Sequence, residues 1–404
     1  MLCFASPLAV LLFAPFIGQM LDASRRSGLF VWVLLLVQVV SIALSGVLLS
    51  SAFWMGLSIV DGWVFVSLLV LQMVEKLSAV TSEVAIERDW IIKICGKGNT
   101  AGLAHGNSMI RRFDLACDFV GTVGVGVIID RMGVGAAVWY CVLMSVLSWP
   151  VINSRLRILD IDREFAVVGK VVDEGATNEW WQRADSPPEP LESPTATSTA
   201  RKRNTIQAYF FDNPMLFSSL VVVLMYFNVA LSPGGILSAY LIHREVTGTG
   251  LAIFRGACAI MGFLGSLVGK ALINARGLVS AGQISLTFVV VTLGISLLAR
   301  IESIALFAAL ISISRMGIWA FDNVNAQLFQ QGTSSTEQSG LAATEAALCS
   351  AAEIMMFGLV IGHEKEVAIE WFGWLGFLGW AMVVGGWIGF FWFSRKQDVL
   401  QLTN

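Results

Sequence analysis

The segment AIERDWIIKICGKGNTAGLAHGNSMIRRFDLACD, residues 85–118, lies between two apolar stretches and carries seven Asp, Glu and Arg side chains. These are Glu87, Arg88, Asp89, Arg111, Arg112, Asp114 and Asp118. Apolar stretches of the flanking length predict membrane-spanning helices. Charged side chains close to a bilayer are costly and therefore usually functional. The fold is expected to bring partners to this segment from elsewhere in the chain.

The composition is that of a membrane protein. Of the 404 residues, 56% are hydrophobic and only 14% are charged, which is too little polar surface to cover a soluble globule of this length. A net charge of −3 gives no reason to expect a nucleic-acid partner. The six cysteines show no CxxC spacing and the three histidines are scattered, so neither a disulfide framework nor a resident metal or other cofactor is predicted.

Hydropathy predicts an all-α, polytopic protein with about eleven membrane spans. A bilayer core of about 30 Å needs about 20 apolar helical residues. Segments of that kind cover approximately residues 2–20, 29–51, 57–84, 108–129, 134–154, 215–241, 248–273, 279–299, 302–323, 341–362 and 369–393. The odd number is explained if the protein has two six-helix halves, a plan common in transporters, and the first helix is missing from the beginning of the chain.

A polar stretch divides the spans into two halves. Residues 1–154 hold five spans and residues 214–394 hold six, followed by a tail over residues 395–404. Residues 155–213 are rich in proline, serine, threonine and charge, so their middle is predicted to be a disordered linker. Lysine and arginine are concentrated in the linker, the tail and the loops on the same side. These parts are therefore predicted to face the cytosol or its topological equivalent.

Two features inside predicted spans indicate a site at membrane depth. The run Ser232-Pro233-Gly234-Gly235 should break its helix, because proline removes a donor and glycine permits non-helical backbone angles. Broken helices at this depth often mark a substrate site, although a simple kink with a re-satisfied backbone gives the same pattern. Glu353 is a lone carboxylate near the middle of another span, where it would either bind a cation or proton or form an internal salt bridge.

The segment ISRMGIWAFDNVNAQLFQQG, residues 313–332, is the expected partner of the opening segment. It places Arg315 inside a span and Asp322 near the cytoplasmic end of that span. A buried Arg315 needs a carboxylate, and Asp89 and Asp114 are available on the same side. A network of this kind between two halves would serve either as a gate that breaks and re-forms or as a static lock, and the residues alone are compatible with both.

At these residues the chain resembles the ferroportin family, metal exporters of the major facilitator type. IERDW at 86–90 and LAHGNSMIRRFD at 103–114 are similar to the family's QRDW and LANMNxxIRRxD segments, and SRMGIWAFD at 314–322 is similar to its ARxGLWxFD segment. MYFNVALSPGGILSAY at 225–240 resembles its broken seventh helix, and GQMLDASRR at 18–26 resembles a major facilitator loop. The resemblance implies the major facilitator fold and a transporter rather than an enzyme.

The resemblance also implies roles for particular residues. The intracellular gate of the family falls on Asp89, Asn107, Arg111, Asp114 and Arg315. The metal site differs, because the Asp-Cys pair of animal members falls near residues 232–234 and the histidine of their eleventh helix falls on Glu353. The helix that supplies an aspartate ligand in the N-terminal half is absent. A carboxylate in place of a thiolate and an imidazole shifts the preference toward oxygen-liganded cations.

From these observations we expect alternating-access transport of a divalent metal, with Fe²⁺ as the expected cargo. Glu353 would bind the metal, and the break at Ser232, Gly234 and Gly235 would line its pathway through the bilayer. Two alternatives stay open: transport of small organic cations or metal chelates on the same fold, and a non-transporting membrane receptor or scaffold. The sequence does not fix the direction of flux, the oligomeric state or the membrane of residence. It is compatible with a monomer, and with the vacuolar, plastid or plasma membrane.

Overall fold

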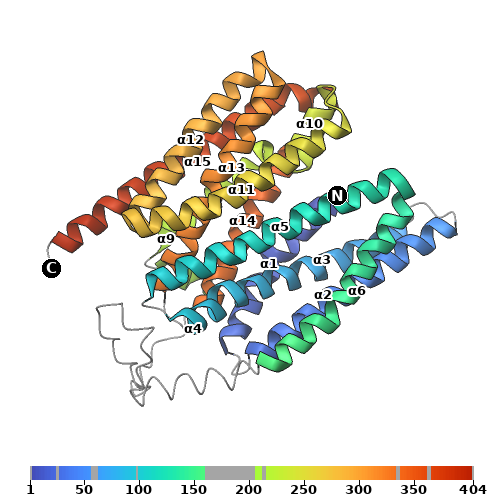
Figure 1. Ribbon diagram of the computed structural model, residues 1–404, viewed down its shortest axis with the longest axis horizontal. Helices are drawn as coiled ribbons and strands as arrows, with labels where there is room; N and C mark the ends of the chain where they lie inside the picture. Colours follow the sequence, from blue (N-terminus) through green and yellow to red (C-terminus); the bar gives the residue numbers. More distant parts are fainter. Residues whose placement is uncertain are drawn as a thin grey trace.

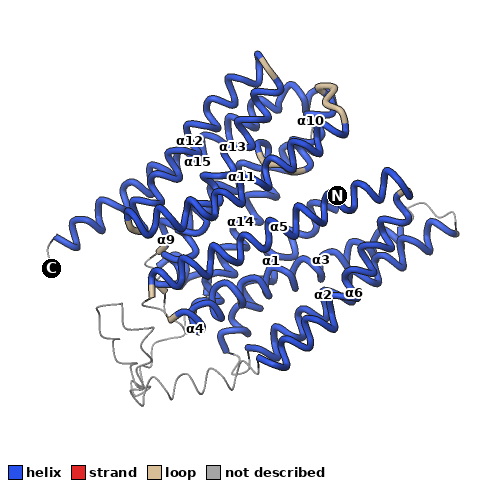
Figure 2. The backbone as a smooth tube through the Cα atoms, viewed as in Figure 1, coloured by secondary structure: helices blue, strands red, loops and turns tan. Residues whose placement is uncertain are grey.

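The protein is almost wholly helical in the computed structural model, which describes residues 2–23, 27–55, 62–96, 99–159, 205–211, 215–333, 337–361 and 365–402. These ranges contain no β-strand (Figure 2). The helices up to the middle of the chain are α1 Leu2–Ala23, α2 Ser27–Trp54, α3 Gly62–Val84, the π-helical turn η1 Ala85–Trp90, α4 Ile91–Cys95, α5 Thr100–Met132, α6 Val134–Leu159 and α8 Thr205–Phe211. Those that follow are α9 Leu216–Met225, the 3₁₀ turn η2 Tyr226–Leu231, α10 Gly235–His243, α11 Gly248–Arg276, α12 Leu278–Glu302, α13 Ile304–Gly332, α14 Gln338–Ile361 and α15 Lys365–Leu402.

The helices form two bundles that lie side by side (Figure 1). Helices α1 to α6 make the N-terminal half, and α9 to α15 make the C-terminal half. The halves meet along two helix pairs, α1 against α14 and α5 against α11. One end of the molecule carries α4, α8 and the first turns of α5 and α14. We call it the linker end, because α6 ends before residues 160–204 and α8 begins after them.

Ten helices or helix runs of the described residues are long and apolar enough to cross a membrane, one fewer than the sequence predicted. The difference is α5, which has 33 residues and ample length. Its charged side chains, among them Arg111, Arg112 and Asp114, make it too polar to qualify by composition. The protein is an integral, multi-pass membrane protein, and α5 is the helix whose polarity has to be satisfied by the rest of the bundle.

Residues 85–95 and 100–118 of the charged segment are helical, so it is not one loop between two spans. α3 continues through η1 into α4, and α5 begins after Asn99, whose side chain accepts a hydrogen bond from the N–H of Gly102 at 2.8 Å. The π-helical turn contains Glu87 and Arg88. Widened turns of this type occur frequently at functional sites, because the extra residue redirects the side chains around it.

Several predicted boundaries shift. α13 continues to Gly332, so Asp322 lies well inside that helix and not near its end. α15 continues to Leu402, through most of the predicted tail. Most of the predicted linker lies outside the described residues, and its described ends are helical, in α6 up to Leu159 and in α8.

The predicted helix break is confirmed. α9 tightens into the 3₁₀ turn η2, and the chain then becomes extended at Ser232, with φ −101° and ψ 150°. Gly234, with φ −114° and ψ −166°, precedes the first residue of α10, Gly235. Pro233, which lies between Ser232 and Gly234, has no N–H and prevents the helical hydrogen bonds from continuing. The break therefore separates two half-helices within one span.

The loop-like motif at residues 18–26 positions α1 against α14. A Cβ at Gly18 would meet the carbonyl oxygen of Ser339 at 2.7 Å, so glycine permits the close approach of the two helices. The Asp22 carboxylate accepts hydrogen bonds from the N–H groups of Ser339 at 2.9 Å and Gly340 at 2.7 Å. An acid at this place satisfies free donors in the first turn of α14 and matches the positive end of its dipole.

The contact between α11 and α13 gives a test of the packing. At Gly265 an added Cβ would lie against the backbone of Met316, 2.9 Å from its Cα. We expect Gly265→Ala to lower the free energy of unfolding by about 1–3 kcal/mol, because backbone cannot yield as a side chain does. Thermal unfolding in detergent measures this. Gly121→Ala in α5, where an added Cβ meets nothing within 4 Å, is the matched control, and equal losses would contradict the packing.

Candidate functional site

A cavity with a volume of about 560 Å³ lies between the two halves. It is lined from α1, α3, the broken helix, α13 and α14. The predicted pathway residues Ser232, Gly234, Gly235 and Glu353 all line it, and so does Arg315. The fold thus brings the helix break and the isolated carboxylate to one place. We call this space the central cavity.

The helix break supplies oxygen atoms to the wall of the central cavity. Ser232 Oγ donates a hydrogen bond to the carbonyl oxygen of Asn228 at 3.0 Å. The side-chain oxygen Oδ1 of Asn228 is buried and has no hydrogen-bond partner among the described residues. Hydroxyl and carbonyl oxygens are ligands of hard divalent cations.

Arg315 does not lie in the network at the linker end, where it was predicted to pair with Asp89 and Asp114. Its Nη2 donates to the carbonyl oxygen of Leu231 at 2.7 Å and its Nη1 to Ser232 Oγ at 3.4 Å, so it contacts the helix break. No carboxylate oxygen of the described residues lies within 4.0 Å of its guanidinium. The sequence placed this arginine too close to the end of α13.

Arg111 of α5 is the centre of the ion pairs at the linker end. Its Nε lies 2.6 Å from Oδ2 of Asp322 on α13, which joins the two halves. Within the N-terminal half, its Nη2 lies 3.1 Å from Glu87 Oε2, and its Nη1 lies 3.4 Å from Glu83 Oε1 and 3.8 Å from Asp114 Oδ2. The predicted grouping of Arg111 with Asp114 is present, but α13 contributes an acid to it and not an arginine.

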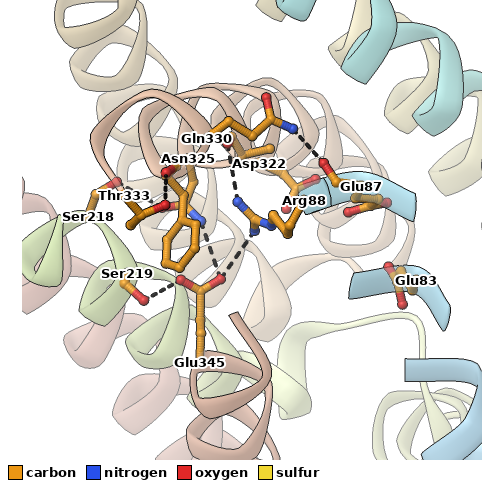
Figure 3. Close-up of polar contacts among 12 residues, drawn as sticks. Glu83, Glu87, Arg88, Ser218, Ser219, Asp322, Asn325, Gln330, Thr333 and Glu345 are labelled. Carbon is orange, nitrogen blue, oxygen red and sulfur yellow. Dashed lines mark hydrogen bonds and ion pairs between the residues drawn. The ribbon is translucent and has the colours of Figure 1, made fainter. Parts of the chain in front are cut away.

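A second ion pair joins η1 to the C-terminal half (Figure 3). Arg88 Nη2 lies 3.4 Å from Oε1 of Glu345, and the two side chains are only 9% and 7% exposed. Arg88 also donates to the carbonyl oxygen of Ala326 at 3.2 Å. Glu345 accepts hydrogen bonds from Ser219 Oγ and, at 3.5 Å, from Asn325 Nδ2. A buried carboxylate supported by this many partners can remain charged where an isolated one could not.

Asn107 and Gln330 form a reciprocal pair of amides across the halves. Asn107 Nδ2 donates to Gln330 Oε1 at 2.9 Å, and Gln330 Nε2 donates to Asn107 Oδ1, also at 2.9 Å. Gln330 Nε2 reaches the carbonyl oxygen of Glu87 as well, at 2.6 Å. The predicted gate residue Asn107 therefore does bridge the halves, through a partner on α13 that the sequence did not indicate.

A smaller cavity, with a volume of about 160 Å³, lies between this network and the central cavity. Lys76, Tyr226, Asp322 and Glu353 line both spaces. Ion pairs on one side and an open cavity on the other are what a closed gate beside a binding site requires. Whether these residues open and close as a gate stays a prediction.

Metal-binding side chains are sparse. The described ranges contain no group of three or more His, Cys, Asp or Glu side chains that could hold a metal ion. Two carboxylates line the central cavity, and one of them, Asp322, is paired with Arg111. The role of Glu353 as a metal ligand stays a prediction. A cargo ion that has to leave again needs weaker binding than a structural metal, and oxygen atoms from the broken helix could complete a transient site.

Three residues show the limits of the sequence at this site. The side chain of Asp89 lies outside the described residues, so its place in the gate stays a prediction. Glu345 was missed, although it is a second carboxylate in the same apolar helix as Glu353, eight residues before it. Gln330 was missed because it is one of five uncharged amides within residues 322–332, and the sequence does not distinguish it from the others.

The ion pair between Arg111 and Asp322 gives the first test of the site. The side chains of Arg111 and Asp322 are 13% and 25% exposed, and Asp322→Asn removes the charge of one of them, so it should loosen the linker end. We expect a cysteine replacing Ala346, which lines the smaller cavity, to react at least about tenfold faster with a maleimide reagent added from that side. The background would lack the native cysteines.

Arg112→Gln is the control, because Arg112 donates to a carbonyl of its own helix, Ser108 O, at 3.1 Å. Equal labelling rates in the two variants would sink the idea that this pair closes the linker end.

The amide pair gives the second test. Asn107→Ala leaves the buried Gln330 amide unsatisfied, which should lower the free energy of unfolding by about 1–3 kcal/mol. Gln330→Ala should cost a similar amount, and the double variant should cost clearly less than the sum of the two. A double-mutant cycle by thermal unfolding measures this coupling. Strict additivity would show that the two amides do not interact in the membrane-embedded protein.

Known proteins resemble this chain along nearly its whole length. The family model described as Ferroportin1 (FPN1) matches residues 1–378. Solute carrier family 40 member 2, chloroplastic, from Oryza sativa subsp. japonica is 24% identical over 98% of this chain and 67% of its own length. Ferroportin from Homo sapiens is 24% identical over 69% of this chain and 54% of its own length. The chain thus spans between half and about two thirds of these curated relatives.

Solved structures agree with the architecture. A bacterial homologue of the iron transporter ferroportin in the outward-facing state superimposes with a TM-score of 0.72, at 20% identity over 97% of this chain and 89% of its own. The fucose:proton symporter of E. coli superimposes with a TM-score of 0.60, at 10% identity over 97% and 90%. These likenesses confirm the predicted major facilitator fold. Because the family model covers almost the entire chain, the protein belongs to the ferroportin family of membrane transporters.

Proposed function

We propose that this protein moves divalent metal ions, with Fe²⁺ as its main cargo, across its membrane by alternating access between the two halves. The observation that carries the proposal is the central cavity, where a carboxylate from α14 and the broken backbone of α9 and α10 meet at the boundary of the halves. Relatives of the chain are described as ferroportin and as homologues of an iron transporter. Family, cavity and donor atoms thus point to the same class of substrate.

The donor atoms suit a divalent cation of intermediate hardness. Glu353 offers a carboxylate, and Ser232 of the helix break offers a hydroxyl oxygen. Oxygen donors bind Fe²⁺ and Mn²⁺, whereas thiolate or imidazole donors would favour softer metals. The described wall of the central cavity contains no cysteine or histidine.

Alternating access is supported by the uneven distribution of polar contacts between the halves. The bonds of Arg88, Asn107 and Arg111 to the C-terminal half all lie at the linker end. Farther along the same interface, α5 and α11 enclose a cavity with a volume of about 570 Å³. A molecule held together by exchangeable polar contacts at one end and open between its halves at the other matches one state of a rocking transporter.

Flux through the reconstituted protein tests the proposal. We expect Glu353→Gln to lower Fe²⁺ flux into proteoliposomes at least about tenfold, because a neutral amide loses the charge that offsets dehydration of the ion. Mn²⁺ should fall in parallel. Glu75→Gln is the matched control, since Glu75 accepts a hydrogen bond from Gln38 at 3.2 Å within the N-terminal half and lines neither cavity.

Two results would count against this function. Metal flux that is unchanged in Glu353→Gln would remove the proposed ligand from the pathway. An absence of flux for every divalent metal tested, with the protein folded, would favour the organic-cation or receptor alternatives instead. A metal-sensitive dye trapped inside the vesicles reports each case directly.

A further inference from the structure

The first turn of α10 lies between two arginine side chains. Arg315 of α13 reaches the residues before it, through Leu231 O at 2.7 Å and Ser232 Oγ at 3.4 Å. Arg255 of α11 reaches it from the other side, donating Nη2 to Ser238 Oγ at 3.1 Å. Two cationic groups from different helices thus converge on the short segment where α10 begins.

Both arginines keep a donor that nothing in the described structure uses. The Nε atoms of Arg255 and Arg315 are each buried without a hydrogen-bond partner, and Arg315 as a whole is only 8% exposed. No carboxylate oxygen of the described residues lies within 4.0 Å of either guanidinium. A buried cation without a counter-charge is costly, and each unsatisfied donor calls for a partner.

The start of α10 adds further donors. Gly234 precedes the helix without any side-chain cap, so the first N–H groups of α10 have no partner within the helix. A Cβ built at Gly235 would meet nothing within 4 Å, which shows that space is open beside these groups. Free N–H groups and the positive end of the helix dipole together favour a bound anion.

The space beside the two arginines is large enough for an organic ligand. Arg255, Arg315 and Pro233 line the cavity between α5 and α11, which has a volume of about 570 Å³. Gly234 and Gly235 line the central cavity instead, and Arg315 lines both cavities. Pockets for small molecules have volumes of about 300–1,000 Å³. Asp118 and Asp130 of α5 also line this cavity, so a ligand there meets two carboxylates from α5 as well as the two arginines from α11 and α13.

We propose that the start of α10, with Arg255 and Arg315, is a binding site for a small organic anion that carries carboxylate groups. Guanidinium N–H groups match the two oxygens of a carboxylate, and two separate arginines suit a ligand with more than one such group. The role of the anion rests on the proposed metal transport. Arg315 also lines the central cavity, so its charge repels a bare divalent cation there, and a carboxylate bound to it removes that repulsion.

Binding to the purified full-length protein in nanodiscs tests the site without any metal. Citrate, titrated calorimetrically, should bind the wild type, and Arg255→Gln and Arg315→Gln should each weaken binding at least about tenfold. Arg300→Gln should leave binding unchanged, because Arg300 also has a buried, unpaired Nε but lines neither cavity. Citrate that fails to bind, or that binds all four proteins equally, overturns the site. If Arg315→Gln does not fold, Arg255→Gln decides, since Arg255 is less buried.

Flux separates the two sources of the carboxylate and separates this site from the proposed function. With labelled citrate and Mn²⁺ in proteoliposomes, co-movement in a fixed ratio identifies a metal chelate as the ligand. Faster Mn²⁺ flux without movement of citrate identifies a separate anion that neutralises Arg315. Citrate binding that depends on both arginines but occurs without any metal flux would refute the metal transport and keep the site. Metal flux that ignores citrate, in a protein that does not bind it, would refute the site and keep the transport.

Discussion

The contact between Arg111 and Asp322 sets the constraint on which the linker end of the molecule depends. A guanidinium and a carboxylate 2.6 Å apart, one from each half, bind the halves together while keeping both charges from facing lipid alone. One carboxylate is not sufficient there, because Arg111 has several donors to satisfy, and Glu87 and Glu83 take the others. This requirement explains why α3 widens into a π-helical turn and why so polar a helix as α5 can stand within the bundle. It also explains why the polar contacts between the halves gather at the same end.

At the central cavity, a buried guanidinium is satisfied without a carboxylate. Arg315 is only 8% exposed, yet it relies on a carbonyl oxygen and a hydroxyl of the broken helix. A cation beside the last carbonyls of η2 is favourable, because the C-terminal end of a helix carries partial negative charge. That interaction satisfies part of the guanidinium and stabilises the break. It does not neutralise the charge, so Arg315 lines the cavity as a cation.

The sequence predicted which segments meet, but not which side chains do so. Charge density within apolar surroundings identified residues 85–118 and 313–332, and both are at the interface. The error at Arg315 has a simple geometric origin, because Arg315 and Asp322 are seven residues apart and lie on the same face of α13, separated by about 10.5 Å along its axis. Helical periodicity predicts which face of α13 a residue lies on but not how deep in the membrane it lies, so Arg315 and Asp322 were both compatible with a place in the gate. Glu345 and Gln330 were not predicted, because their contacts across the interface are with Arg88 and Asn107 of the other half, and the sequence does not show these pairings.

The position of Arg315 and Asp322 on one continuous helix has a mechanical consequence for the proposed transport cycle. The backbone between them is regular α-helix, and a single helix of this length moves as a stiff body over so short a distance. Release of Asp322 from Arg111 would therefore displace Arg315 relative to Leu231 and disturb the helix break that lines the central cavity. Conversely, a ligand that draws Arg315 away from the break would strain the ion pair at the linker end. In the proposed cycle, the linker end and the cavity would thus be coupled through α13, and the coupling would act in both directions because it is a property of one equilibrium.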